Sequence, residues 1–123
     1  MTPLNVLIVD DSLVATKLLA RSLEELGHNV VGTAKTGAEA VTAYGAHNPD
    51  LVTMDLTMPD MDGIQATKNI MAAYRDAHVI MVTSHAQKTM VMDALKAGAR
   101  GYILKPFQTD RLRAALERAM GTA

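Results

Sequence analysis

The stretch LNVLIVDDS, residues 4–12, joins a short apolar run to two carboxylates and a serine. Residues 4–9 are almost continuously apolar and rich in Val, Ile and Leu, which is typical of a strand buried on both faces of a sheet. The run ends abruptly at Asp10 and Asp11, and Ser12 can cap a following helix. The stretch therefore predicts a strand-to-helix unit in a sheet that helices cover on both faces.

Outward from this stretch, short apolar runs alternate with longer segments of helical period along the whole chain, which indicates a parallel α/β sheet. The strands are predicted at residues 4–9, 28–34, 51–54, 78–83 and 101–104. The helices are predicted to follow Ser12 up to Gly27 and to span residues 36–47, about 64–74, about 88–97 and about 109–120. We expect one domain, residues 1–123, with a doubly wound, flavodoxin-like five-stranded parallel sheet in the order 2-1-3-4-5 and five helices.

The apolar spacing within two of these helices predicts their inner faces. One side of the first helix holds Leu18, Leu19, Leu23 and Leu26. In the fourth helix, Val91 and Leu95 can face the core. Met90 and Met92 stand to either side of that stripe, where they suit an adaptable partner surface or simply pack at the helix margins.

Composition and charge exclude several classes of function. The chain has 123 residues, no cysteine and a formal net charge of −1 from acidic and basic residues mixed along it, so disulfides, thiolate zinc sites and thiol nucleophiles are excluded. No basic block could neutralise several phosphates of a nucleic acid, and no apolar run approaches the roughly 20 residues that span a bilayer. We expect a soluble cytoplasmic protein that binds neither nucleic acid nor membranes directly.

Three carboxylates follow the first and third predicted strands. In the order 2-1-3-4-5 these strands are neighbours, so their ends lie about 5 Å apart and bring Asp10, Asp11 and Asp55 together where such sheets bind ligands. Their mutual repulsion favours a bound divalent cation, and all-oxygen ligands with room for water and phosphate favour Mg²⁺ over Ca²⁺. Each aspartate taken alone could instead end a strand or cap a helix. Asp60 and Asp62, in the loop that follows, are expected to be solvated turn residues.

Thr83 and Lys105 stand at the ends of the fourth and fifth predicted strands, at the same sheet edge. With a cation, they could offset the charge of an acyl phosphate on Asp55, the lysine as a point charge and the threonine as a hydrogen-bond donor. Read singly, Thr83 is an ordinary β-branched strand residue and Lys105 a solvated side chain. The set as a whole predicts a phosphoryl site with Asp55 as the acceptor.

Four motifs at these strand ends resemble the receiver domain of two-component response regulators. They are Asp10-Asp11, Met54-Asp55 followed by Met58-Pro59, Thr83-Ser84, and Lys105-Pro106-Phe107. The likeness covers the whole chain and extends to the stretches LIVDDS, DLVTMDLTMPDMDG and GYILKPF. Without an output domain, the chain resembles the stand-alone chemotaxis type of this family.

The resemblance implies a set of metal ligands around the acceptor. Asp55 would be the phosphoacceptor and would share the Mg²⁺ ion, with Asp11 as a direct ligand and Asp10 acting mainly through water. The backbone carbonyl of Thr57 would be a further ligand. Thr57 and His85 differ from the commonest chemotaxis-type residues at their positions, and their side chains could gate attacking water and so tune dephosphorylation.

The resemblance also implies a switch. Thr83 would bond the phosphoryl oxygen, Lys105 would pair with it, and Tyr102 would turn inward as Thr83 moves. The change would be read on the surface formed by the fourth helix, the fifth strand and the fifth helix. The Lys105-Pro106 peptide bond is usually cis in this family.

The partners that the resemblance implies are a histidine kinase as phosphodonor, an output protein such as a flagellar motor component, and a phosphatase. Such a protein is a signalling switch and not an enzyme, beyond catalysing its own phosphorylation and dephosphorylation. Three alternatives stay open: a receiver excised from a longer transcription factor or methylesterase, a stand-alone phosphate sink or shuttle, and an aspartyl-phosphate phosphatase. The phosphatase interpretation needs a second Asp where Thr57 stands, which disfavours it.

Overall fold

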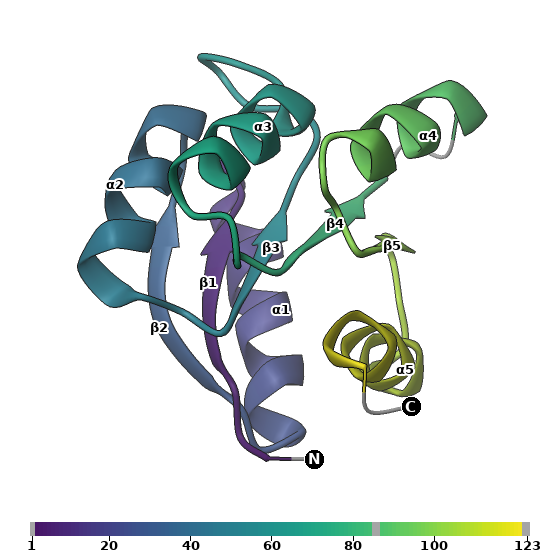
Figure 1. Ribbon diagram of the computed structural model, residues 1–123. Helices are drawn as coiled ribbons and strands as arrows, with labels where there is room; N and C mark the ends of the chain where they lie inside the picture. The colour runs from purple at the N-terminus through teal and green to yellow at the C-terminus, as the bar shows by residue number, and fades with distance from the viewer. Residues whose placement is uncertain (1, 85–86, 122–123) are drawn as a thin grey trace.

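The computed structural model describes residues 2–84 and 87–121, which build one sheet of five parallel strands (Figure 1). The strands are β1 (Asn5–Val9), β2 (Asn29–Ala34), β3 (Leu51–Met54), β4 (Val79–Thr83) and β5 (Gly101–Leu104). Their order is β2-β1-β3-β4-β5, and every neighbouring pair is parallel. The predicted fold class and strand order are confirmed.

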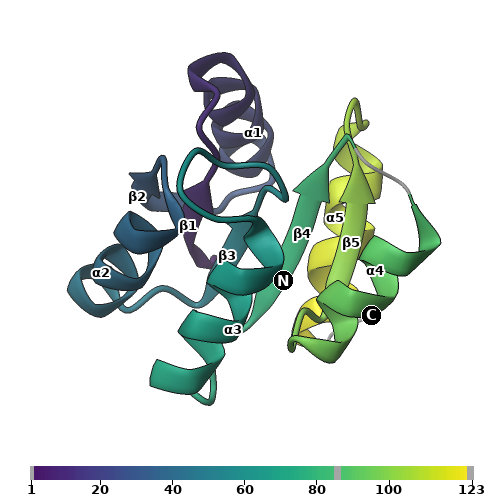
Figure 2. The same ribbon diagram turned by 90° about the horizontal axis from the view of Figure 1, so that it is seen from above.

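Five helices connect and cover the strands. They are α1 (Leu13–Glu25), α2 (Gly37–His47), α3 (Gly63–Ala73), α4 (Lys88–Lys96) and α5 (Thr109–Met120). The first and last cover one face of the sheet and the other three cover the opposite face (Figure 2). Ser12, Thr36 and Asp62 cap α1, α2 and α3, because each side chain accepts a backbone N–H of the first turn.

The strands send alternate side chains into two cores. In β1, Leu7 and Val9 join the core under α2, α3 and α4, while Val6 and Ile8 join the core under α1 and α5. All four are at most 1% exposed, as expected of a central parallel strand. The strand ends are therefore held by packing on both faces, which positions the residues that follow them.

The prediction that Leu18 and Leu95 face the core is wrong. Leu18 is 58% exposed and Leu95 is 45% exposed. In α1 the buried residues are Leu19 and Leu23, a narrower stripe than the spacing suggested. In α4 the inward-facing residues are Ala94, which is buried, and Met90, one helical turn earlier. Leu95, the next residue after Ala94, therefore points outward.

The methionines of α4 divide between the core and the surface. Met90 packs against the core under α2, α3 and α4, whereas Met92 is 46% exposed. Of the two, only Met92 therefore has a side chain that a partner could contact. Within residues 2–84 and 87–121, the structure forms no helix with the length and apolarity needed to cross a bilayer.

Candidate functional site

An acidic cluster lies at the carboxyl ends of β1 and β3. Val9 pairs with Met54 in the register of these strands, and the Asp55 N–H donates to the Val9 carbonyl at 2.9 Å. The hydrogen bonding between β1 and β3 thus continues as far as Asp55, where the loop begins. Carboxylate oxygens of Asp10, Asp11 and Asp55 lie within 4.8 Å of one another, so the predicted convergence is confirmed.

The three carboxylates differ in how they are held. Asp10 is only 6% exposed, and its Oδ1 accepts the Ser12 N–H at 2.9 Å. Asp11 is exposed, and the Asp55 side chain is 12% exposed. The hydrogen bond from the Ser12 N–H to Asp10 was not among the sequence-based expectations, although an aspartate two residues before a helix cap is a usual signal for such a turn.

Lys105 brings a positive charge to this cluster from the end of β5. Its Nζ lies 2.5 Å from Asp10 Oδ2 and 3.7 Å from Asp55 Oδ1. Its backbone N–H donates to the Thr83 carbonyl at 2.8 Å, and its peptide bond to Pro106 is cis. Residues from three strand ends therefore meet at one point.

The electrostatics of the cluster favour a further cation. Burial raises the pKa of the Asp55 carboxyl above its ordinary value; the Lys105 ammonium opposes this, and the charges of Asp10 and Asp11 add to it. One ammonium thus only partly offsets three carboxylates. The donor set is all oxygen, which fits a hard divalent cation such as Mg²⁺ held by Asp10, Asp11 and Asp55.

The other predicted site residues lie around this point. Thr83 is fully buried at the end of β4, and Thr57 is exposed in the loop between β3 and α3. Tyr102, in β5, pairs in register with Met81 of β4. Its hydroxyl oxygen is buried and has no hydrogen-bond partner among the residues that the structure describes. His85 lies outside the described residues.

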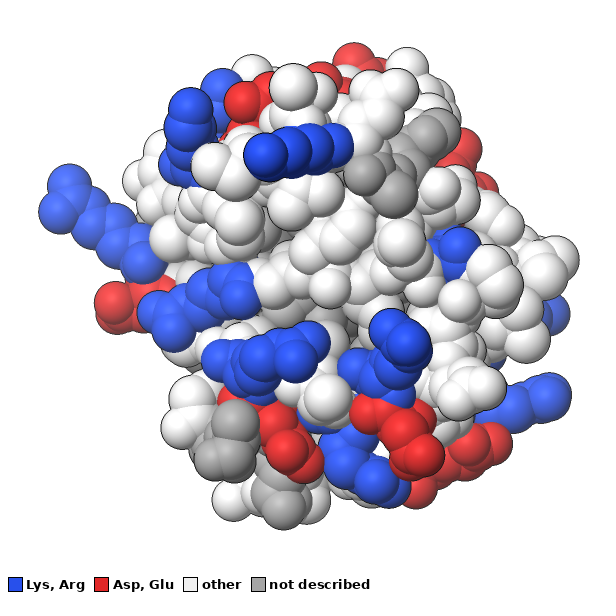
Figure 3. Space-filling view, turned by 90° about the vertical axis from the view of Figure 1, so that its right-hand side faces the viewer, with Lys and Arg blue, Asp and Glu red and all other residues white. Residues whose placement is uncertain are grey.

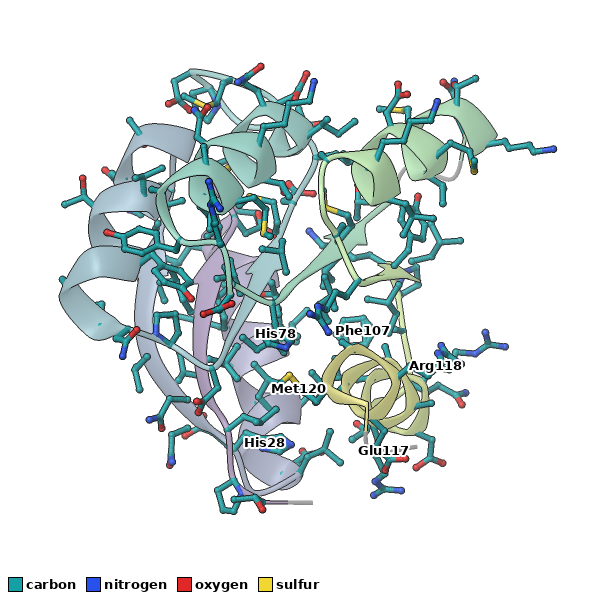
Figure 4. All side chains as sticks on the ribbon, viewed as in Figure 1. His28, His78, Phe107, Glu117, Arg118 and Met120 are labelled. Atoms are coloured by element: carbon teal, nitrogen blue, oxygen red, sulfur yellow. The ribbon has the colours of Figure 1, made fainter. Side chains whose placement is uncertain are left out.

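Two histidines lie at the opposite end of the sheet, near the amino ends of β2 and β4 (Figure 4). His28 is buried, and its Nδ1 accepts the Leu4 N–H at 2.9 Å. His78 is partly buried. Their distance from the acidic cluster leaves them no part in the site.

The loop after Asp55 contains contacts that the sequence analysis missed. Asp60 and Asp62 are exposed but are not merely solvated turn residues. Asp60 accepts two backbone N–H groups at the amino end of α2, and Asp62 accepts one at the amino end of α3. The Gly63 N–H donates to the Leu56 carbonyl at 2.7 Å, and a Cβ on Gly63 would collide with the Asp55 carbonyl oxygen. The Asp-Gly pair at 62–63 indicates a turn in the sequence. It does not indicate that Gly63 packs against the backbone of Asp55.

Charge is less evenly distributed than the overall composition suggests. Residues 1–87 hold five Lys and Arg against ten Asp and Glu, whereas residues 88–121 hold seven against three. The basic side chains of the second group spread over the face formed by α4, β5 and α5 (Figure 3). That face also carries a groove of about 680 Å³, lined in part by Tyr102, Leu104, Phe107, Arg111 and Arg118.

Comparisons with known proteins point to one family. Residues 6–117 match the response regulator receiver domain. The chemotaxis protein CheY of Bacillus subtilis is 45% identical over 115 residues, which are 94% of this chain and 96% of that protein. The transcriptional regulatory protein PdtaR of Mycobacterium tuberculosis is 42% identical over 118 residues, which are 96% of this chain and 57% of that protein. Among solved structures, a chain of the CheX-CheY-BeF3-Mg²⁺ complex from Borrelia burgdorferi superposes with a TM-score of 0.92. It is 40% identical, and the match covers 96% of this chain and 90% of that one.

Proposed function

The chain belongs to the response regulator receiver domain family, and from this premise we propose that it is a switch activated by phosphorylation of Asp55 in the presence of Mg²⁺. One observation carries the proposal: Asp10, Asp11, Asp55 and Lys105 meet at the carboxyl edge of the sheet. In the proposal, Asp55 is the nucleophile, the three aspartates are cation ligands, and Lys105 supplies a further positive charge. Those are the parts that phosphoryl transfer requires.

In the proposed reaction, a carboxylate oxygen of Asp55 attacks the phosphorus of a phosphohistidine on the donor kinase. An oxygen–phosphorus bond forms as the bond from phosphorus to the histidine nitrogen breaks. Asp10, Asp11, Asp55 and the Thr57 carbonyl would hold Mg²⁺, which supplies positive charge against the phosphoryl oxygens. Lys105 would exchange part of its contact with Asp10 for one with the phosphoryl group.

The proposed switch runs through Thr83 and Tyr102. Thr83 is buried at the end of β4, where a small shift toward a phosphoryl group on Asp55 would alter packing near β5. The buried Tyr102 hydroxyl, unpartnered among the described residues, supports two arrangements of this side chain, since a conformation that pairs it would be favoured by the restored hydrogen bond. Thr57 and His85 would tune the rate of dephosphorylation.

The groove and basic side chains on α4, β5 and α5 support this face as the place where an output protein binds. Exposed Met92 lies on the same face. The similarity to CheY over nearly the full length of both chains supports a single receiver domain that acts in chemotaxis. In that role, a flagellar motor component would be the output target. Its kinase, its phosphatase and the protein itself would then act in the cytoplasm.

The similarity to PdtaR, of which the chain spans about half, supports one alternative: the receiver part of a longer regulator. A stand-alone phosphate sink is the other. In each case the chain would catalyse only its own phosphorylation and dephosphorylation.

The chemistry is tested by incubating the protein with Mg²⁺ and a small acyl-phosphate donor and weighing the intact chain. We expect a phosphate-mass adduct on the wild type, none on Asp55→Asn, and none after chelation of the metal. Asp76→Asn, which changes an exposed carboxylate away from the cluster, is the matched control and should label normally. An adduct that persists undiminished in Asp55→Asn would refute the acceptor assignment.

The output is tested separately by comparing the partners that bind untreated and beryllofluoride-treated protein. A messenger should recover different partners in the two states. Identical recoveries would favour a sink or shuttle.

A further inference from the structure

The loop between β3 and α3 is anchored on α2 by the carboxylate of Asp60. The Gly37 N–H donates to Oδ1 at 2.8 Å, and the Ala38 N–H donates to Oδ2 at 3.0 Å. These hydrogen bonds lower the pKa of the Asp60 carboxyl, so it is ionised at neutral pH. Both carboxylate oxygens are therefore engaged by a single helix terminus, which itself favours negative charge.

Helix α2 has an N-cap residue of its own in addition to Asp60. The Thr36 hydroxyl accepts the Glu39 N–H at 3.0 Å, and the Glu39 carboxylate accepts the Lys35 N–H at 2.8 Å. This pair resembles a capping box, except that Glu39 accepts the N–H of the residue before the N-cap. The two hydrogen bonds to Asp60 are thus additional to the helix's own cap, and their main consequence falls on the loop that carries Asp60.

A second contact fixes the loop at the same place. The side chain of Met61 covers Gly37 so closely that a Cβ on this glycine would collide with it. The Asn69 amide of α3 donates to the Met61 sulfur at 3.6 Å. Loop residues 60 and 61 are consequently held between α2 and α3.

Along the loop, Thr57 lies between Asp55 of the acidic cluster and the anchored residues Asp60 and Met61. Its neighbours Leu56 and Met58 are buried at 1% and 8% exposure, and the loop arches over the carboxyl ends of the strands (Figure 2). The position of the Thr57 carbonyl is therefore set by packing on one side and by the Asp60 clamp on the other. We propose that Asp60 is a positioning residue for the metal site: by tying the loop to α2, it holds the Thr57 carbonyl where a divalent cation can bind it. This inference rests on the proposed function.

The test measures the Mg²⁺ dissociation constant with the metal alone, from the shift of backbone amide NMR signals. Asp60→Ala should weaken binding about tenfold, as loss of an outer-shell partner typically does. Asp60→Asn should retain part of the affinity, because its amide oxygen can still accept the Gly37 N–H. Thr36→Ala is the matched control, since it removes a cap from the same helix without touching the loop. It should lower the melting temperature and leave the dissociation constant unchanged.

Measuring the dissociation constants at low and high salt distinguishes a positioning role of Asp60 from a direct effect of its charge. A remote carboxylate that acts only through its field would lose its effect in high salt, whereas the clamp predicts the same ratio of dissociation constants at low and high salt. Equal affinities of wild type and Asp60→Ala would overturn the inference. The inference also fails if the ratio collapses in high salt, if Asp60→Asn shows no rescue, or if Thr36→Ala weakens binding as much. If the wild type binds no Mg²⁺, the proposed function fails together with the inference.

Discussion

The ammonium of Lys105 pairs most closely with Asp10, at 2.5 Å from Oδ2, and lies 3.7 Å from Oδ1 of the proposed acceptor Asp55. The lysine therefore occupies a carboxylate that a metal ion would also use. Without the metal, it supplies part of the charge that the ion would supply. The two cations should compete.

Lys105→Ala should consequently bind Mg²⁺ more tightly than the wild type while accepting phosphate more slowly. Removal of one positive charge from this cluster should tighten binding about tenfold, or about 1.4 kcal/mol. The labelling rate should fall because no ammonium then meets the phosphoryl group. Metal titration by NMR and the time course of the mass adduct measure the two effects, and Lys68→Ala, an exposed lysine in α3, is the control. Weaker metal binding in Lys105→Ala would contradict the competition.

Asp55→Asn should raise the stability of the metal-free protein at neutral pH. Burial raises the pKa of this carboxyl in the folded state, so the folded protein binds its proton more tightly than the unfolded chain does. The stabilisation is therefore complete below the ordinary carboxyl pKa and is lost as pH rises through the raised value. Thermal melts should show the asparagine variant above the wild type at neutral pH, with the gap closing in acid. A variant less stable than the wild type at neutral pH would argue against this account.

His28 should make stability fall in mild acid. Burial lowers its pKa from 6.5, and its Nδ1 must stay unprotonated to accept the Leu4 N–H. Its contribution is thus complete above the ordinary value and is lost as pH falls toward the lowered one, by at most about 1.4 kcal/mol per pH unit. His28→Asn keeps an acceptor but cannot titrate, so urea unfolding should show a shallower pH dependence. Equal slopes in the two proteins would contradict the prediction.

Tyr102→Phe should leave the unphosphorylated protein as stable as the wild type, or more stable by up to about 1 kcal/mol. The hydroxyl is buried without a partner among the described residues, so its removal abolishes an uncompensated desolvation cost. Calorimetric melts measure this directly. A clear loss of stability would mean that the hydroxyl has a partner in solution.

The sequence predicts the acidic cluster correctly because strand ends are marked twice, by the end of an apolar run and by an aspartate. Parallel pairing then brings Asp10 and Asp55 together without any information on side-chain geometry. The inner face of α4 is predicted less well, because Met90 and Ala94 face the core and the larger Leu95 does not. The helical period alone does not show which of two adjacent apolar stripes packs inward.

The role of Asp60 could not be predicted from the sequence. Its partners lie 22 and 23 residues earlier in the chain, and they are backbone N–H groups. Every residue except proline carries such a group, so no residue type marks the pairing. The contact between Asp60 and α2 becomes apparent only in the three-dimensional structure.

The basic side chains on the face of α4, β5 and α5 make the charge of the molecular surface uneven. An uneven surface charge experiences a torque in the field of a charged partner, so the protein would be turned before it touches that partner. Acidic partners would meet it with the basic face of α4, β5 and α5 in front. This alignment raises the fraction of productive collisions in dilute salt and fades once the Debye length is shorter than the approach distance.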